Sequence, residues 1–204
     1  MDPILTNYEK RYAGAEYYWG TEPGAFCDEL IALKPVPGAR VLDIGCGEGK
    51  DAVYLAQKGY AVTAFDIAPS GVAKAKRLAR ERGVAIDAYT DDINAFRTDG
   101  TFDIVYSTGT IQYLRDENRA AFFEKINRIT RVHGIAYFNV FVEKPFLPLP
   151  PDWDVGEKMW KSGELFTCFP DWKVHRVEER IFEDDSGGAP HFHCMDTIIC
   201  EKMP

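Results

Sequence analysis

The sequence of 204 residues predicts a single, doubly wound α/β domain, with a mostly parallel sheet and helices on both of its faces. Two observations predict this class. Short apolar segments alternate with helical segments between residues 40 and 142, as in folds where a crossover helix follows each strand. The chain then ends in two strand-like segments around a turn-rich stretch, which is typical of an antiparallel hairpin added to the sheet.

The elements follow in order along the chain. Residues 1–34 are expected to form a helical, aromatic cap, which ends at the prolines and glycine of 35–38 because these residues cannot continue a helix. The predicted strands are Arg40–Ile44, Ala61–Asp66, 85–89, 102–106 and 135–142. The predicted helices are 50–58, 69–82 and 116–131, with Pro69 in a first turn and Gly83 and Gly134 as stops.

Residues 143–172 differ from the rest of the chain in composition. They contain five of the 12 prolines and three of the four tryptophans. A connection this long in a compact domain is usually functional, so we expect a lid over the acceptor site. A structured loop that packs its own small core is the alternative. The terminal hairpin is expected to pair 172–182 with 191–201.

Charge and composition argue against nucleic-acid-binding, membrane-spanning and secreted proteins. The net charge of −8 repels phosphate backbones, so no nucleic-acid partner is expected. The sequence contains no apolar run long enough for a membrane helix, and its start lacks the features of a signal peptide. Five cysteines without a CxxC pair favour reduced thiols and a cytoplasmic location.

The stretch VLDIGCGEGK at 41–50 carries the clearest ligand-binding signal. Three alternating glycines follow a buried strand, where they let a ligand approach the backbone closely. A nicotinamide enzyme would have its third glycine at position 50, which is Lys50 here. Asp43 and Glu48 flank the loop, and these carboxylates favour a ligand with positive groups over a pyrophosphate. S-adenosylmethionine, with its ammonium and sulfonium, is such a ligand.

Three further strand ends carry polar groups. Asp66 lies 21 residues after Gly45, where a carboxylate can accept hydrogen bonds from ribose hydroxyls. The carboxylates of 89–94 can accept from an adenine amino group, and the strand 102–106 leads into Ser107. All of these positions lie at the carboxyl ends of strands, where open α/β sheets bind ligands.

Over residues 35–142 these motifs resemble the class I S-adenosylmethionine-dependent methyltransferases. The resemblance implies a seven-stranded sheet of order 3-2-1-4-5-7-6, with the last inserted strand antiparallel. It implies the following cofactor contacts: Gly45, Cys46 and Gly47 for the methionine moiety, Asp43 and the carbonyl of Ser107 for its ammonium, Asp66 for the ribose, and Asp92 and Ile93 for the adenine, with Ile67 as a further cofactor-binding residue. An alternative alignment gives Asp91 the adenine role.

A narrower resemblance covers nearly the whole chain. NYEKRY, DIGCGEGKDAVYLAQKGYAVTAFD, FDIVYSTGTIQYL and MWKSGELFTCFPDWKV are similar to segments of the tellurite-resistance methyltransferase family. The pattern YEKRY…YYWGTEP also resembles thiopurine-type methyltransferases, which implies that Tyr12 and Trp19 cover the cofactor and that Arg11 meets its carboxylate. The final hairpin departs from the tellurite family, because His191-Phe-His-Cys194 stands where that family carries basic residues.

The expected function is therefore direct, in-line methyl transfer to a small soft nucleophile, either a thiol or a chalcogen such as tellurite or selenite. Gln112 and Tyr113 are the expected acceptor-side polar groups, and no catalytic acid or base is assigned. A non-catalytic S-adenosylmethionine-binding module and a nicotinamide-dependent reductase are the alternatives. No metal is expected, because no further ligand accompanies His191 and His193 at a recognisable spacing. The two histidines are instead expected to lie on the surface of a strand pair.

Overall fold

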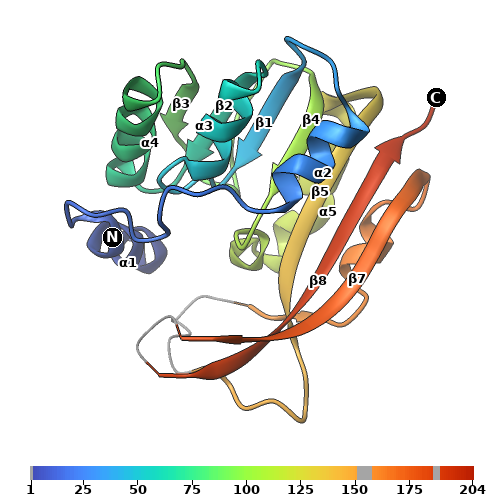
Figure 1. The fold of residues 1–204 in the computed structure, drawn as a ribbon. Helices are drawn as coiled ribbons and strands as arrows, with labels where there is room; N and C mark the ends of the chain where they lie inside the picture. Colours follow the sequence, from blue (N-terminus) through green and yellow to red (C-terminus); the bar gives the residue numbers. More distant parts are fainter. Residues whose placement is uncertain (1, 151–157, 186–188) are drawn as a thin grey trace.

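The structure is a computed structural model that describes residues 2–150, 158–185 and 189–204. Its 8-stranded sheet has the order β3-β2-β1-β4-β5-β8-β7, with β6 paired to β5 outside this path (Figure 1). The strands are β1 (Arg40–Ile44), β2 (Ala61–Asp66), β3 (Asp87–Thr90), β4 (Phe102–Ser107), β5 (Thr130–Glu143), β6 (Trp160–Lys161), β7 (Trp172–Asp184) and β8 (His191–Lys202). The helices are α1 (Pro3–Tyr12), α2 (Phe26–Leu33), α3 (Lys50–Gln57), α4 (Pro69–Glu81) and α5 (Asp116–Ile129), with short 3-10 turns η1 (Ile111–Tyr113) and η2 (Leu165–Cys168).

The predicted strand order is confirmed when the short β6 is left out of the count. Strands β3, β2, β1, β4 and β5 pair in parallel. Strand β8 runs antiparallel to both of its neighbours, β5 and β7, and so forms the predicted hairpin. The pairing of β6 with β5 was not expected from the sequence.

Helices cover both faces of the sheet, as predicted (Figure 1). On one face, Leu30 of α2, Leu55 of α3 and Val72 of α4 belong to one buried apolar cluster with the central strands. On the other face, Phe122 and Ile126 of α5 lie in a second, strongly aromatic cluster. No helix among the described residues is both long and apolar enough to cross a membrane.

The start of β5 differs from the prediction. The helix ends at Ile129 rather than at 131, and Gly134 lies inside the strand instead of ending the helix. The Thr130 hydroxyl donates to the Ile126 carbonyl at 2.7 Å, and His133 adopts a positive φ of 62°. The β4–β5 register shifts at the same level, so regular pairing begins only at Ile135. Local side-chain and backbone geometry therefore turns the helix end directly into a strand.

The segment 143–172 contributes partly to the core. Trp160 is almost fully buried against Phe123, and Trp172 packs against Phe169. Lys158, in contrast, lines the large cavity described below. Trp153 lies outside the described residues, so a lid role for this segment stays a prediction.

The sharp turn between β1 and α3 gives a testable prediction. Gly49 has a φ of +87°, and a Cβ there would lie 2.5 Å from the Ala75 Cβ, whereas Gly59 has a similar φ of +90° with open space around it. Backbone strain alone should lower the free energy of unfolding of Gly49→Ala by roughly 1–3 kcal/mol. We expect a larger loss, because the new methyl group would also collide with Ala75 and force α4 away from the start of α3. Gly59→Ala is the matched control for strain alone, and equal losses in chemical denaturation would contradict the close-packing argument.

Candidate functional site

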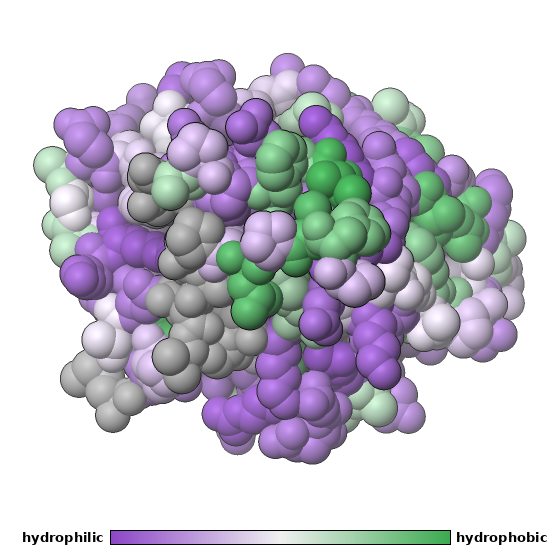
Figure 2. Space-filling model, turned by 90° about the horizontal axis from the view of Figure 1, so that it is seen from below, coloured by the Kyte–Doolittle hydropathy of each residue, from purple (hydrophilic) through white to green (hydrophobic). Residues whose placement is uncertain are grey.

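A cavity of about 570 Å³ lies at the carboxyl ends of the parallel strands. Residues that follow four successive strands line it: Gly45 after β1, Ile67 after β2, Asp91 after β3 and Thr108 after β4. The face of the protein seen from below gathers apolar side chains at its centre, with hydrophilic residues around them (Figure 2). The sheet topology thus brings segments that are far apart in sequence to one site, as expected for open α/β folds.

The glycine loop between β1 and α3 forms the floor of this cavity. Gly45 has a φ of +76°, and a Cβ there would lie 2.2 Å from the Thr110 hydroxyl oxygen. The N–H groups of Gly45 and Cys46 both donate to the Phe65 carbonyl at 2.9 Å, which fixes the loop to β2. A side chain larger than hydrogen at Gly45 would therefore displace Thr110, which lies in the segment after β4 and also lines the cavity.

Two buried carboxylates border the loop. The Tyr106 hydroxyl donates to Asp43 Oδ2 at 2.7 Å, and burial raises the pKa of Asp43. Asp66 accepts from the N–H groups of Gly47, at 2.8 Å, and Ala68, at 2.9 Å. Burial nevertheless raises the pKa of Asp66 to about 6. Because burial disfavours the charged form of both groups, a ligand with positive charge or hydroxyl donors would stabilise them.

A buried ion pair connects the loop to the N-terminal region. Lys74 Nζ lies 2.7 Å from Glu48 Oε1, and both side chains are almost fully buried. The other Glu48 oxygen accepts from the Trp19 N–H at 3.1 Å, and the Trp19 indole donates to the Tyr12 hydroxyl at 3.1 Å. The aromatic residues of the N-terminal region are thereby held at the edge of the cavity.

The carboxylates after β3 differ in their partners. Asp91 accepts from the backbone N–H groups of Asp92 and Arg97, one at each of its oxygens. The hydrogen bonds of Asp92 come from Asn94 and are made at Oδ1. Asp91 therefore holds the loop in shape, and this difference favours Asp92 over Asp91 for contact with a ligand.

Strands β5 and β8 form the wall opposite the glycine loop. Alternate residues of each strand line the cavity: Asn139 and Phe141 from β5, and His193 and Met195 from β8. Asn139 accepts from the Gly109 N–H at 2.7 Å and so positions the loop after β4. Gln112 is buried and donates to the Gly109 carbonyl, while its Oε1 has no hydrogen-bond partner among the described residues.

The structure brings nearly all of the expected site residues together. The cavity is lined by Arg11, Tyr12, Trp19, Asp43, Gly45, Cys46, Gly47, Asp66, Ile67, Asp92, Ile93, Gln112 and Tyr113. Ser107 is not among the lining residues: its hydroxyl is buried and donates to the Ile44 carbonyl within the sheet, and the next residue, Thr108, lines the cavity. The predicted contact of the Ser107 backbone carbonyl with the cofactor stays a prediction. Asn139 and Phe141 were missed, although a lone asparagine within an apolar strand could have signalled the first.

The expectation of a surface pair at His191 and His193 is wrong. Both side chains are buried, with 8% and 5% of their surface exposed. His193 packs between the rings of Phe141 and Phe182, with centroid distances of 4.7 and 5.7 Å. The two histidines are therefore part of the protein interior and not of its surface.

The chain is similar to known methyltransferases. Residues 41–134 match a family model described as a methyltransferase domain. The chain is 25% identical over 156 residues to the probable S-adenosyl-L-methionine-dependent methyltransferase TehB of Haemophilus influenzae, a match that covers 76% of this chain. The chain spans about half of that relative's length, with 54% covered.

Solved structures share the fold. The crystal structure of Haemophilus influenzae TehB has a TM-score of 0.75 at 22% identity, and covers 97% of this chain and 66% of its own. A protein from a study of the conversion of a disulfide bond into a thioacetal group during echinomycin biosynthesis has a TM-score of 0.72 at 21% identity, with 98% and 90% covered. The N-methyltransferase NodS of Bradyrhizobium japonicum, in complex with S-adenosyl-L-homocysteine, has a TM-score of 0.71 at 18% identity, with 98% and 99% covered.

Proposed function

Because the chain belongs to the class I S-adenosylmethionine-dependent methyltransferases, we propose that it transfers a methyl group to a small soft nucleophile, a thiol or a chalcogen compound. The observation that carries the proposal is the single cavity that joins the carboxylate-lined glycine loop to the wall of β5 and β8. A donor held at the loop and an acceptor held at the wall would share this one space.

The residues of the loop side fit the donor. S-adenosylmethionine supplies a methyl group that is already activated by its attachment to a positive sulfonium. Asp43 stabilises the ammonium, and Asp66, followed by Ile67, accepts from the ribose hydroxyls. The buried state of both carboxylates strengthens these interactions.

The remaining cofactor contacts come from two other segments. Asp92 and Ile93 meet the adenine, while Arg11, Tyr12 and Trp19 of the N-terminal cap enclose the methionine end. Because an activated donor needs chiefly a well-placed nucleophile, these residues act by positioning and by excluding water, which can contribute about 7–11 kcal/mol.

The opposite wall favours a small, soft acceptor. Phe141 and Met195 are apolar and polarisable, and Gln112 offers a buried carbonyl oxygen. Strand β8 contributes no lysine or arginine to the cavity. Arg115 and Lys158 line it elsewhere, and the Lys158 ammonium is paired with Asp116 at 2.7 Å. A small oxyanion in a dry site requires paired positive groups. We therefore place thiols slightly ahead of tellurite or selenite, and the net charge of −8 speaks against nucleic acid.

The relatives support acceptors of this kind in two ways. The similarity to the probable methyltransferase TehB supports methyl transfer, and the resemblance of the sequence to the tellurite-resistance family implies a chalcogen acceptor. The fold similarity to the protein of echinomycin biosynthesis, whose chemistry converts a disulfide bond into a thioacetal, favours sulfur. The five cysteines are unpaired, which fits a reducing, cytoplasmic location for the protein.

The test is a comparison of acceptors under one set of conditions. Formation of S-adenosylhomocysteine is measured with aliphatic thiols, aromatic thiols, selenite and tellurite, and we expect the fastest turnover with a thiol. Strong turnover on tellurite with none on thiols would overturn the preference for thiols. Tight S-adenosylhomocysteine binding without turnover on any acceptor would instead show a non-catalytic binding module.

A further inference from the structure

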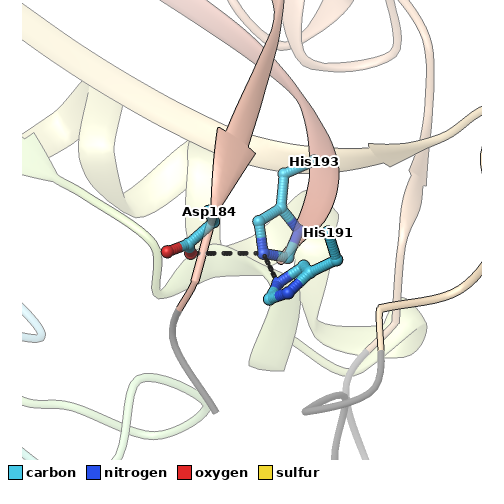
Figure 3. Close-up of side chains that lie close together, drawn as sticks. All are labelled: Asp184, His191 and His193. Atoms are coloured by element: carbon cyan, nitrogen blue, oxygen red, sulfur yellow. Dashed lines mark hydrogen bonds and ion pairs between the residues drawn. The ribbon is translucent and has the colours of Figure 1, made fainter. Parts of the chain in front are cut away.

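Three side chains meet at the end of the β7–β8 hairpin (Figure 3). Asp184 comes from β7, and His191 and His193 come from β8. The register pairs Asp184 directly with His191, and the two-residue period of a strand places His193 on the same face. The sequence shows only the His-x-His pair, whereas the hairpin register supplies the carboxylate.

The distances within this cluster match those between ligands of one metal ion. His191 Nε2 lies 2.9 Å from His193 Nε2, which in turn lies 3.4 Å from Asp184 Oδ2. Zinc bonds of about 2.0–2.1 Å at tetrahedral angles separate neighbouring ligand atoms by about 3.3 Å. All three ligand atoms lie within 4.8 Å of one another, so a small inward adjustment would complete the geometry.

The tautomer of His191 is also the one that a metal-binding histidine needs. Its Nδ1 lies 2.7 Å from the Ala189 carbonyl oxygen, which can only accept a hydrogen bond. The proton of the neutral ring is therefore on Nδ1, and the lone pair of Nε2 points toward His193. A carbonyl that fixes the non-ligating nitrogen in this way is the usual outer-shell partner of a metal-bound histidine.

We propose that Asp184, His191 and His193 bind a divalent transition-metal ion of the zinc class. Two imidazoles and one carboxylate are a ligand set that zinc takes at sites with an open position. His193 also lines the main cavity, next to Met195, so the ion lies at the acceptor end of the site.

This position suggests how the ion would act, a role that rests on the proposed function. The open position takes the sulfur of a thiol, which loses its proton to solvent and becomes a bound thiolate. The sulfur lone pair then forms the new S–CH₃ bond as the carbon–sulfonium bond breaks. The electron pair of the broken bond stays on the departing thioether, so no oxidant or reductant is needed.

The test begins with metal binding to the full chain, independent of activity. Zn²⁺ is titrated by calorimetry, and Co²⁺ is used as a probe because its visible spectrum reports four-coordinate geometry. We expect one ion per chain. His191→Ala and His193→Ala should each weaken Zn²⁺ binding by more than the roughly 10–100-fold that loss of an outer-shell partner costs.

His175→Ala is the matched control, since His175 lies on β7 and pairs with Glu201 at the other end of the hairpin. S-adenosylhomocysteine binding by each variant shows that the variant is folded. The metal site would be overturned if the original protein bound no stoichiometric Zn²⁺, or if the variants at His191 and His193 bound Zn²⁺ as tightly as the original protein does. Either result would leave the proposed function intact.

Activity then tests the role of the ion. Thiol turnover should fall on treatment with a chelator and return with added Zn²⁺. Turnover that survives complete metal removal would overturn the role in acceptor activation. Zn²⁺ binding at these residues with no methyl transfer to any acceptor would overturn the proposed function and leave the metal site standing.

Discussion

Lys74→Met is expected to lower the free energy of unfolding by about 3–5 kcal/mol, because it leaves the buried Glu48 carboxylate without its cation. Lys74 Nζ contacts Glu48 Oε1 at 2.7 Å and the Glu16 carbonyl at 2.5 Å, so the substitution removes the contact to the loop and the contact to the N-terminal region together. Chemical denaturation at pH 7 measures the loss, and Lys76→Met, at an exposed position of the same helix, is the matched control.

A double-mutant cycle separates the ion pair from simple packing. Glu48→Gln removes the buried charge, so Lys74→Met should cost less in that background than in the original protein. Equal costs in both backgrounds would show that the pair is not coupled. Since Glu48 also accepts from the Trp19 N–H, we expect Lys74→Met to weaken S-adenosylhomocysteine binding as well.

Asp66→Ala is expected to weaken S-adenosylhomocysteine binding by about 1.5–3 kcal/mol, or about 10- to 150-fold in Kd, the range for hydrogen bonds to a charged group. Calorimetry measures this change, and Asp87→Ala, an exposed aspartate at the start of β3, is the control. Unchanged affinity in Asp66→Ala would remove Asp66 from the ribose site.

The pH dependence follows from the same carboxyl group. Burial raises the pKa of Asp66 to about 6, above its ordinary value of about 3.9. The charged form accepts from the ribose, so affinity should fall as pH drops through about 6, and the fall should be absent in Asp66→Ala. In the cofactor-free protein the sign is opposite, because the buried charged carboxylate destabilises the fold. This destabilisation is absent below about pH 4 and reaches its full size above about pH 6, so the free energy of unfolding should fall as pH rises through this range.

Much of the fold could be predicted because the physics that determines it is local. Alternating apolar and helical segments, Pro69 in a first turn and Gly83 after a helix all act within a few residues, and the structure confirms each of them. The prediction that Gly134 ends a helix is wrong because the feature that decides it is not local. The strand begins at Thr130 because β4 pairs with it across the sheet, and no short window of sequence contains that pairing.

The residues of the candidate site also fall into those that local sequence predicts and those that depend on strand pairing. The glycine loop and Asp66 follow their own strands directly, so spacing along the chain predicts them. Asn139, Met195 and the burial of His193 depend on which strands become neighbours and on their register. The antiparallel placement of β8 between β5 and β7 decides these contacts, and the sequence indicates that placement only through a family resemblance.

The position of β8 between two partners has a consequence for selectivity. A slip of one residue along a strand exchanges its two faces, so it would turn His193 and Met195 away from the cavity and bring in Phe192 and Cys194. Strand β8 is hydrogen-bonded on both edges, so such a slip must break two ladders at once. The choice of acceptor is thereby protected against small shifts. Strand β7, which among the described residues pairs with β8 alone, has a bulge between Val174 and Arg176 that can absorb an insertion without shifting the register at Asp184.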